Sequence, residues 1–154
     1  MFRSVALPST ITGRIFLSSM PGRFGPCEKA LEDVTTYGIS CIVCLASSED
    51  IERQSARYAR ALASGTVPCP VIRFPIPDFE QPADSNSFMS LVRETEDKVR
   101  RGANILVHCG AGVGRTGVFA VSVLLAMGIA LPDAAELVEK AGSHPETPPQ
   151  KGFC

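Results

Sequence analysis

The segment from residue 105 to residue 125 constrains the fold of this 154-residue chain more than any other segment. A short apolar run, Ile105–Val107, predicts a buried strand, and the apolar run Val118–Leu125 predicts a buried helix. Between them, residues His108–Gly117 have the sequence HCGAGVGRTG. Glycine adopts positive φ angles without strain and lets backbone approach a ligand closely. We therefore expect a strand, a tight loop and a helix whose N-terminus faces the same small volume as the loop amides.

Two side chains of this loop suit the binding and cleavage of a phosphate ester. Arg115 carries a planar guanidinium group that can hold two phosphate oxygens at once. Cys109 lies six positions earlier, and a thiol in such a positive field is expected to react as a thiolate near neutral pH. A thiolate can attack phosphorus as a nucleophile. The loop amides, the helix that starts near Thr116 and Arg115 together predict a site for a tetrahedral dianion.

The wording VHCGAGVGRTG resembles the active-site loop of the cysteine-dependent protein tyrosine phosphatases, in which a His-Cys pair is followed by five residues, an arginine and a serine or threonine. The resemblance implies that Cys109 is the nucleophile, that a phosphocysteine intermediate forms, and that Arg115 binds phosphate and stabilises the transition state. It also implies that Thr116 hydrogen-bonds the sulfur leaving group and that His108 orients the loop. A core histidine with satisfied hydrogen bonds is the alternative for His108. The implied phosphate-binding loop consists of Gly110, Ala111, Gly112, Val113, Gly114 and Arg115.

A proton donor is needed when an alkoxide or phenoxide leaves phosphorus. The candidate is Asp78, in the proline-rich segment RFPIPDFEQP (residues 73–82) that follows a predicted strand. Prolines keep such a loop extended, and strand ends are where open α/β sheets bind ligands. In the small dual-specificity branch of the family the acid lies on a loop of this kind, upstream of the cysteine. Glu80 and Asp84 are alternatives, and an Asx turn is the structural alternative for Asp78.

Gln150 is a further candidate near the end of the chain. Residues 146–150, ETPPQ, resemble the Thr-Pro-x-Gln stretch of several small family members, in which the glutamine is credited with positioning the hydrolytic water. An exposed glutamine at a helix start is an equal alternative. The family usually has another helix after this stretch, whereas the chain ends at Cys154, so we expect that helix to be missing or trimmed.

Strand and helix patterns alternate along the chain, which predicts an α/β fold with a central, mostly parallel sheet of four to five strands and helices on both faces. Together with the resemblance, this is the protein tyrosine phosphatase fold. The segment IFLSSMPG (residues 15–22) resembles the start of kinase-associated and related dual-specificity phosphatases. Strands are predicted at 14–18, 39–46, 71–74 and 104–107, and helices at 28–37, 51–63, 85–101, 116–129 and 133–140.

The length of the chain favours a single domain, residues 1–154. Its balanced charge indicates that neither nucleic acid nor a membrane is the partner. Fifteen basic and sixteen acidic residues leave a net charge of −1. Met1–Leu7 lacks the apolar core of a secretory signal, and the longest hydrophobic stretch, 118–131, is shorter than the roughly twenty residues of a spanning helix. The two histidines lack ligand spacing, so no metal or cofactor is expected. We expect a cytoplasmic monomer.

The six cysteines do not have the spacing of a secreted disulfide framework. Cys41 and Cys44 lie in one predicted strand, where positions three apart point to opposite faces. Both are therefore expected to be buried. A further hypothesis is that Cys44 lies close enough to Cys109 to form a reversible protective disulfide.

The expected substrate is a phosphorylated protein or peptide. The chain has no room for the long phosphotyrosine-recognition loop of the larger tyrosine-specific members, so the pocket should be shallow and could accept phosphoserine and phosphothreonine as well as phosphotyrosine. Inositol lipids are disfavoured because Gly110 and Val113 supply no charge where lipid phosphatases of the family have lysines. RNA 5′-phosphates, a non-catalytic phosphate-binding module and rhodanese-like sulfur transfer are the remaining alternatives.

Overall fold

The apolar segment NILVH forms the central strand of a five-stranded sheet in the computed structural model, which describes residues 1–153. The strand order is β1-β2-β5-β3-β4, and all neighbouring pairs are parallel except β1 with β2. The strands comprise Arg3–Ser4 (β1), Arg14–Ser18 (β2), Cys41–Cys44 (β3), Val71–Arg73 (β4) and Asn104–His108 (β5). The predicted α/β architecture with a mostly parallel sheet is confirmed.

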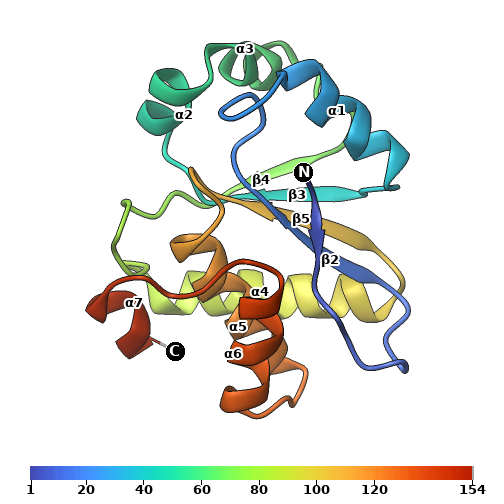
Figure 1. Ribbon diagram of the computed structural model, residues 1–154, viewed down its shortest axis with the longest axis vertical. Coiled ribbons are helices and arrows are strands. Elements are labelled where there is room, and N and C mark those ends of the chain that lie inside the picture. Colours follow the sequence, from blue (N-terminus) through green and yellow to red (C-terminus); the bar gives the residue numbers. More distant parts are fainter. Residues whose placement is uncertain (154) are drawn as a thin grey trace.

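Helices cover both faces of the sheet (Figure 1). On one face lie α1 (Cys27–Thr36), α2 (Ser48–Gln54) and α3 (Ala56–Ser64). On the other lie α4 (Ser85–Arg100), α5 (Gly114–Ala126), α6 (Leu131–Lys140) and α7 (Pro148–Phe153). Alternate residues of β5 enter the two cores: Ile105 and Val107 pack toward α4 and α5, and Leu106 packs toward α1. The central strand is therefore buried on both sides, which explains its continuous apolar sequence.

The helix predicted over residues 51–63 is two helices, α2 and α3, separated at Ser55. Ser55 has φ −154° and ψ 87°, outside the helical region, and its hydroxyl accepts a hydrogen bond from the amide N–H of Tyr58. Ser47 caps α2 in the same way through the N–H of Asp50. The apolar spacing continues across the break, so periodicity alone did not reveal it, although serine is a favoured N-cap.

The C-terminal segment forms a short helix that includes the Thr-Pro-Pro-Gln stretch itself, which the sequence analysis expected to precede a missing or trimmed helix. Helix α7 begins at Pro148, directly after Thr147. The Oε1 atom of Gln150 accepts hydrogen bonds from the N–H groups of Glu146 (2.7 Å) and Thr147 (3.3 Å). This is the reach-back contact of a capping box, and proline at the first helical position supports the same start. The sequence Thr-Pro-Pro-Gln is thus itself the helix start.

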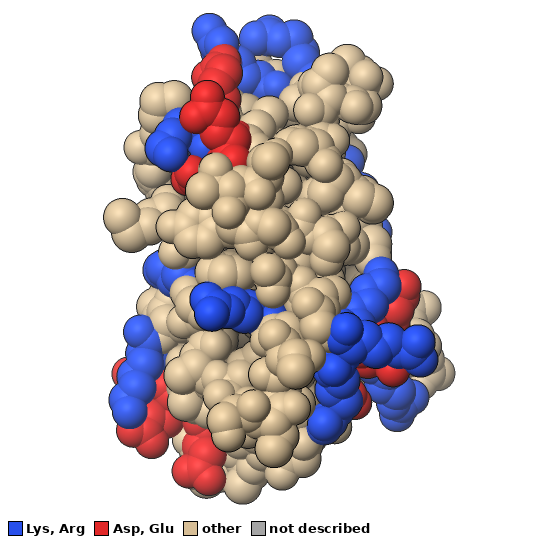
Figure 2. All heavy atoms as spheres, turned by 90° about the vertical axis from the view of Figure 1, so that its right-hand side faces the viewer, with Lys and Arg blue, Asp and Glu red and all other residues tan. Residues whose placement is uncertain are grey.

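Charged side chains of both signs lie side by side on the face shown in Figure 2. Helix α4 contributes ion pairs between residues one turn apart, Lys98–Glu94, Arg100–Glu96 and Arg101–Asp97. Such mixed clusters differ from the single-sign stripe typical of nucleic-acid-binding surfaces. Within residues 1–153, no helix has the length and apolar character needed to cross a membrane.

Phe88 of α4 should be the side chain whose truncation destabilises the fold most clearly. It is fully buried, and its ring lies 5.9, 5.6 and 5.1 Å from the ring centroids of Phe74, Phe119 and Phe153. We expect Phe88→Ala to lower the free energy of unfolding by about 3–5 kcal/mol in urea denaturation, because it removes buried surface and leaves a cavity. Phe24→Ala is the control, since Phe24 is 71% exposed. Equal effects of the two variants would contradict this packing.

Candidate active site

The loop between β5 and α5 lies at the carboxyl end of the central strand. The N–H groups of residues 110–113 donate no hydrogen bond to any described residue. Gly112 has φ +78°, and a Cβ atom there would collide with the backbone of Ser18 and Ser19 at the end of β2. Only glycine fits this close approach. Unpaired amides of successive residues followed by a helix N-terminus are an arrangement that suits an anion, so the anion site stays a prediction.

Cys109 is the first residue of this loop, directly after β5, with only 3% of its surface exposed. The hydroxyl of Thr116, in the first turn of α5, donates a hydrogen bond to the Cys109 Sγ atom (3.1 Å). A donor in this position stabilises negative charge on sulfur. The structure thus brings together two of the predicted residues.

The carbonyl of Gly112 is held on the outside of the loop by Arg3 and Ser143. The Nη2 atom of Arg3 donates to this oxygen (2.8 Å), and the Ser143 hydroxyl donates to it as well (2.5 Å). Arg3 also donates to the carbonyl of Ala141 at the end of α6. Burial lowers the pKa of Arg3, and the nearby Cys109 opposes this effect. Sequence reasoning missed Arg3, because nothing near residue 3 indicates a contact with a loop more than a hundred positions away.

His108 is fully buried and supports the loop from behind. Its Nδ1 atom lies 3.0 Å from the carbonyl oxygen of Cys109, which can only accept, so Nδ1 is the donor. Its Nε2 atom lies 2.8 Å from the hydroxyl of Tyr58 in α3. Burial, together with Cys44, raises the pKa of Tyr58, so the phenol stays neutral. Both ring nitrogens of His108 therefore have hydrogen-bond partners. This arrangement is compatible with both alternatives from the sequence, a histidine that orients the loop and a core histidine with satisfied hydrogen bonds.

The hypothesis of a disulfide between Cys44 and Cys109 is wrong for this arrangement. Cys44 packs in the cluster formed with Met20 and Tyr58 on the α1–α3 side of the sheet. Cys109 belongs to the cluster on the opposite side, with Cys41 and Val107. The two thiols thus pack in separate clusters, and both are free. The related prediction that Cys41 and Cys44 are buried on opposite faces is confirmed.

Arg115 is the most enclosed charged group of the site, with 1% of its side chain exposed. Its Nη1 atom donates to a carboxylate oxygen of Asp50 (3.0 Å) and to the carbonyl of Ile76 (2.9 Å). Its Nη2 atom lies 3.3 Å from Oδ1 of Asp78. Among the described residues its Nε–H has no partner. An unpartnered buried donor is costly, so this N–H is the natural contact for a bound phosphate oxygen.

Asp50 is a site residue that the sequence did not single out. It lies in the first turn of α2 and binds Arg115 and, on its other oxygen, Arg53. Burial alone would raise the pKa of Asp50, but the hydrogen bond and positive charge of Arg115 outweigh burial and hold the pKa below its usual value. The carboxylate is therefore charged at neutral pH. Its only sequence signal was acidic character at a helix start, which the helix dipole already explains.

The proline-rich loop brings Asp78, and not its two alternatives, to Arg115. The loop is anchored by the N–H of Ile76, which donates to the carbonyl of Leu45 (3.0 Å). Asp78 has 43% of its side chain exposed, so one side faces Arg115 and the other faces solvent. Asp84 instead caps α4 through Ser87, and Glu80 is exposed.

The residue after Asp78 connects this loop to the C-terminal segment. Phe79 has φ +63°, a strained conformation for a non-glycine residue, and its N–H donates to Asp78 Oδ1 (3.0 Å). Its carbonyl accepts a hydrogen bond from the hydroxyl of Thr147 (2.7 Å). The acid loop is thus tied at both ends, to Arg115 and to the start of α7.

Gln150 is fully buried rather than exposed, and it lies against the phosphate-binding loop. A Cβ atom at Gly114 would be 2.8 Å from Gln150 Oε1 and 3.2 Å from its Nε2. The Oε1 atom is used in the capping contacts of α7, whereas Nε2 has no partner within residues 1–153. Nε2 is therefore the atom left to contact a water or a bound phosphate.

Comparisons with known proteins agree with this geometry. The family model described as "Swiss Army Knife protein, DSP-PTPase phosphatase domain" matches residues 14–152. Kinase associated phosphatase (KAP) has a similar structure, with a TM-score of 0.84 and 18% identity over 99% of this chain and 90% of that chain. Tk-PTP in its active form gives a TM-score of 0.72 and 25% identity over 96% and 95% of the two chains. P. aeruginosa TpbA in complex with pTyr gives 0.60 and 16% identity over 97% and 86%. No curated protein matched the sequence.

Replacing Asp50 by asparagine should lower the phosphatase activity without removing any group expected to contact the phosphate. Arg115 would lose its charged partner in α2. A hydrogen bond between charged groups is worth enough free energy to affect the rate about 10-fold. We therefore expect kcat/KM for p-nitrophenyl phosphate to fall by about 10-fold or more. Asp33→Asn is the matched control, because within residues 1–153 Asp33 forms its ion pair with Lys29 of the same helix, α1. Wild-type activity in Asp50→Asn would contradict the role of this pair.

Proposed function

The chain belongs to the DSP-PTPase phosphatase domain family, whose members are cysteine-dependent phosphatases, and we propose that it hydrolyses phosphotyrosine in proteins through a phosphocysteine intermediate. The observation that supports the proposal is that one short segment carries three unused groups: the unpaired amides of residues 110–113, the unpartnered Nε–H of Arg115 and the sulfur of Cys109, which accepts from Thr116. Together they suit a tetrahedral phosphate next to a nucleophile.

In the first proposed step the sulfur of Cys109 attacks phosphorus while the ester oxygen leaves on the opposite side. The S–P bond forms, the P–O bond breaks, and the carboxylic acid of Asp78 gives its proton to the departing phenoxide. The loop amides and Arg115 hold the non-bridging oxygens, whose charge is spread in the transition state. Asp50 and the carbonyl of Ile76 keep the guanidinium in place.

In the second proposed step water displaces the thiolate. The Asp78 carboxylate accepts a proton from the attacking water, the O–P bond forms, and the S–P bond breaks. Thr116 donates to the sulfur as its negative charge returns, which the 3.1 Å contact supports. The free Nε2 of Gln150 beside Gly114 supports the role of orienting this water. Inorganic phosphate is then released.

The choice of phosphotyrosine rests on one relative, P. aeruginosa TpbA, which has a similar fold and is described with bound pTyr. A shallow pocket would also accept phosphoserine and phosphothreonine. The proposed enzyme acts as a cytoplasmic monomer on phosphorylated proteins and needs no cofactor.

Cys109→Ser should abolish turnover of a phosphotyrosine peptide, by at least about a thousandfold in kcat, because the hydroxyl is a far weaker nucleophile. The variant should still bind the peptide, which isothermal titration calorimetry can measure, since the amides and Arg115 remain. Cys69→Ser is the control, because Cys69 lies outside the site. Residual activity near the wild-type level would rule out cysteine chemistry.

Asp78→Asn should slow hydrolysis most for substrates whose leaving group needs a proton to depart. We expect kcat for phosphotyrosine to fall by about 100-fold. The loss should be smaller for p-nitrophenyl phosphate, whose phenoxide is stable without a proton. Glu80→Gln is the control; if it reproduces these effects and Asp78→Asn does not, the acid is Glu80.

A further inference from the structure

Thr147 connects the start of α7 to the acid loop, the segment of residues 74–84 between β4 and α4. Its hydroxyl donates a hydrogen bond to the carbonyl of Phe79 (2.7 Å), the residue directly after Asp78. Figure 1 shows the two segments next to each other, although the two residues lie 68 positions apart in the sequence. No step of the proposed reaction uses this hydrogen bond, so the contact needs a separate explanation.

The hydrogen bond from Thr147 ends on a strained residue. Phe79 has φ +63°, a left-handed conformation that is unfavourable for a residue with a Cβ atom and persists only where other contacts hold it. Its side chain is 56% exposed, so packing of the ring does not account for the conformation. Its N–H donates to Asp78 Oδ1 (3.0 Å), and the N–H of Glu80 donates to the carbonyl of Pro77 (3.0 Å). Hydrogen bonds therefore hold the backbone on both sides of Phe79.

These contacts determine which carboxyl oxygen of Asp78 is available for proton transfer. Oδ1 accepts from the N–H of Phe79 and lies 3.3 Å from Nη2 of Arg115. Within residues 1–153 Oδ2 forms no hydrogen bond, so it is the oxygen that can carry a proton to the leaving group. If the carbonyl of Phe79 moved away from Thr147, the N–H of the same residue would also move away from Oδ1. The direction of the carboxyl group therefore depends on Thr147.

Thr147 belongs to a segment that is fixed on the phosphate-binding loop. The N–H of His144 donates to the carbonyl of Val113 in that loop (3.1 Å). A Cβ atom at Gly117 would collide with the backbone of His144, which shows how closely the segment approaches α5. The N–H of Thr147 donates to Oε1 of Gln150 (3.3 Å) in the first turn of α7. Thr147 therefore holds the acid loop at a set distance from the phosphate-binding loop.

We propose that Thr147 is a positioning residue that keeps the carboxyl group of Asp78 directed at the leaving-group oxygen. This inference rests on the proposed phosphatase function. The hydroxyl of Thr147 holds the strained Phe79, Phe79 holds Oδ1 of Asp78, and Oδ2 delivers the proton. Loss of the hydroxyl should therefore impair proton donation and leave the attack by Cys109 intact.

Aryl phosphates with different leaving groups separate proton donation from the rest of the reaction. The phenoxide of p-nitrophenyl phosphate leaves without a proton, whereas that of phenyl phosphate needs one. The value of kcat/KM reports the step in which this group departs. We expect Thr147→Val, which keeps the shape of the side chain, to lower kcat/KM by about 10-fold for phenyl phosphate. For p-nitrophenyl phosphate the loss should be less than about 2-fold.

Two further variants show whether the hydroxyl acts through Asp78. Thr147→Ser retains a hydroxyl and should restore kcat/KM for phenyl phosphate to within about 3-fold of wild type. In an Asp78→Asn background, Thr147→Val should change kcat/KM for phenyl phosphate by less than about 2-fold, because no proton is left to position.

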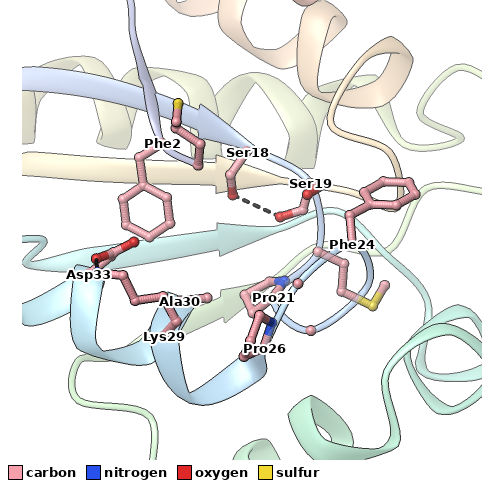
Figure 3. A pocket seen from close by; sticks show the side chains of 13 residues that line it. Phe2, Ser18, Ser19, Pro21, Phe24, Pro26, Lys29, Ala30 and Asp33 are labelled. Carbon is pink, nitrogen blue, oxygen red and sulfur yellow. Dashed lines mark hydrogen bonds and ion pairs between the residues drawn. The ribbon is translucent and has the colours of Figure 1, made fainter.

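Thr95→Val is the matched control, because the Thr95 hydroxyl is buried and donates to the carbonyl of Leu91 (2.8 Å) within α4. Lys29→Ala is a control for a change beside the phosphate-binding loop. Lys29 borders the cavity in Figure 3, whose lining also includes Ser19, next to Gly112, and no residue of the acid loop or α7. Both variants should keep the wild-type ratio of kcat/KM for the two substrates.

With an active wild type, four results overturn the proposal. They are an equal loss for both substrates in Thr147→Val, an unchanged rate for phenyl phosphate in that variant, a Thr147→Ser variant as impaired as Thr147→Val, and effects of Thr147→Val and Asp78→Asn that multiply. A changed substrate ratio in Thr95→Val would contradict it as well. Failure of wild type to hydrolyse even p-nitrophenyl phosphate would instead refute the proposed function itself.

Discussion

The buried guanidinium group of Arg115 is the interaction on which the rest of the site depends. Removing a charge from water costs several kcal/mol, so a buried cation persists only where the fold provides partners. Here the partners come from two other segments: the Asp50 carboxylate at the start of α2, and the acid loop through Ile76 and Asp78. Because one ion joins these segments to α5, the group proposed to bind phosphate also assembles the residues that would act on it.

Contacts from several segments of the chain also hold the loop between β5 and α5. His108 binds the carbonyl of Cys109 from one side of the sheet, and Arg3 and Ser143 bind the carbonyl of Gly112 from another direction. These contacts use the carbonyls of Cys109 and Gly112, whereas the amides of residues 110–113 remain unpaired within the described chain. The loop geometry therefore depends on segments from both ends of the chain.

How far the sequence predicts this site depends on where each residue lies along the chain. Cys109, Thr116 and Arg115 lie in one short segment whose spacing and glycines specify its geometry, so they were predicted together. Asp78 was predicted because prolines mark its loop. Arg3 and Asp50 each have a local explanation, as a strand residue and a helix-start residue, and only the tertiary fold brings them to the loop. The break at Ser55 was missed for the opposite reason, because the apolar period continues through it.

The central claim is that the pocket formed by the loop amides and Arg115 presents phosphorus to the sulfur of Cys109. Mass spectrometry of the enzyme, quenched in acid during turnover of a phosphotyrosine peptide, tests it most directly. The account predicts one phosphoryl group on the peptide that contains Cys109, present during turnover and lost when the substrate is exhausted. A phosphoryl group on another residue, or product formation at full rate with unmodified Cys109 throughout, would contradict it.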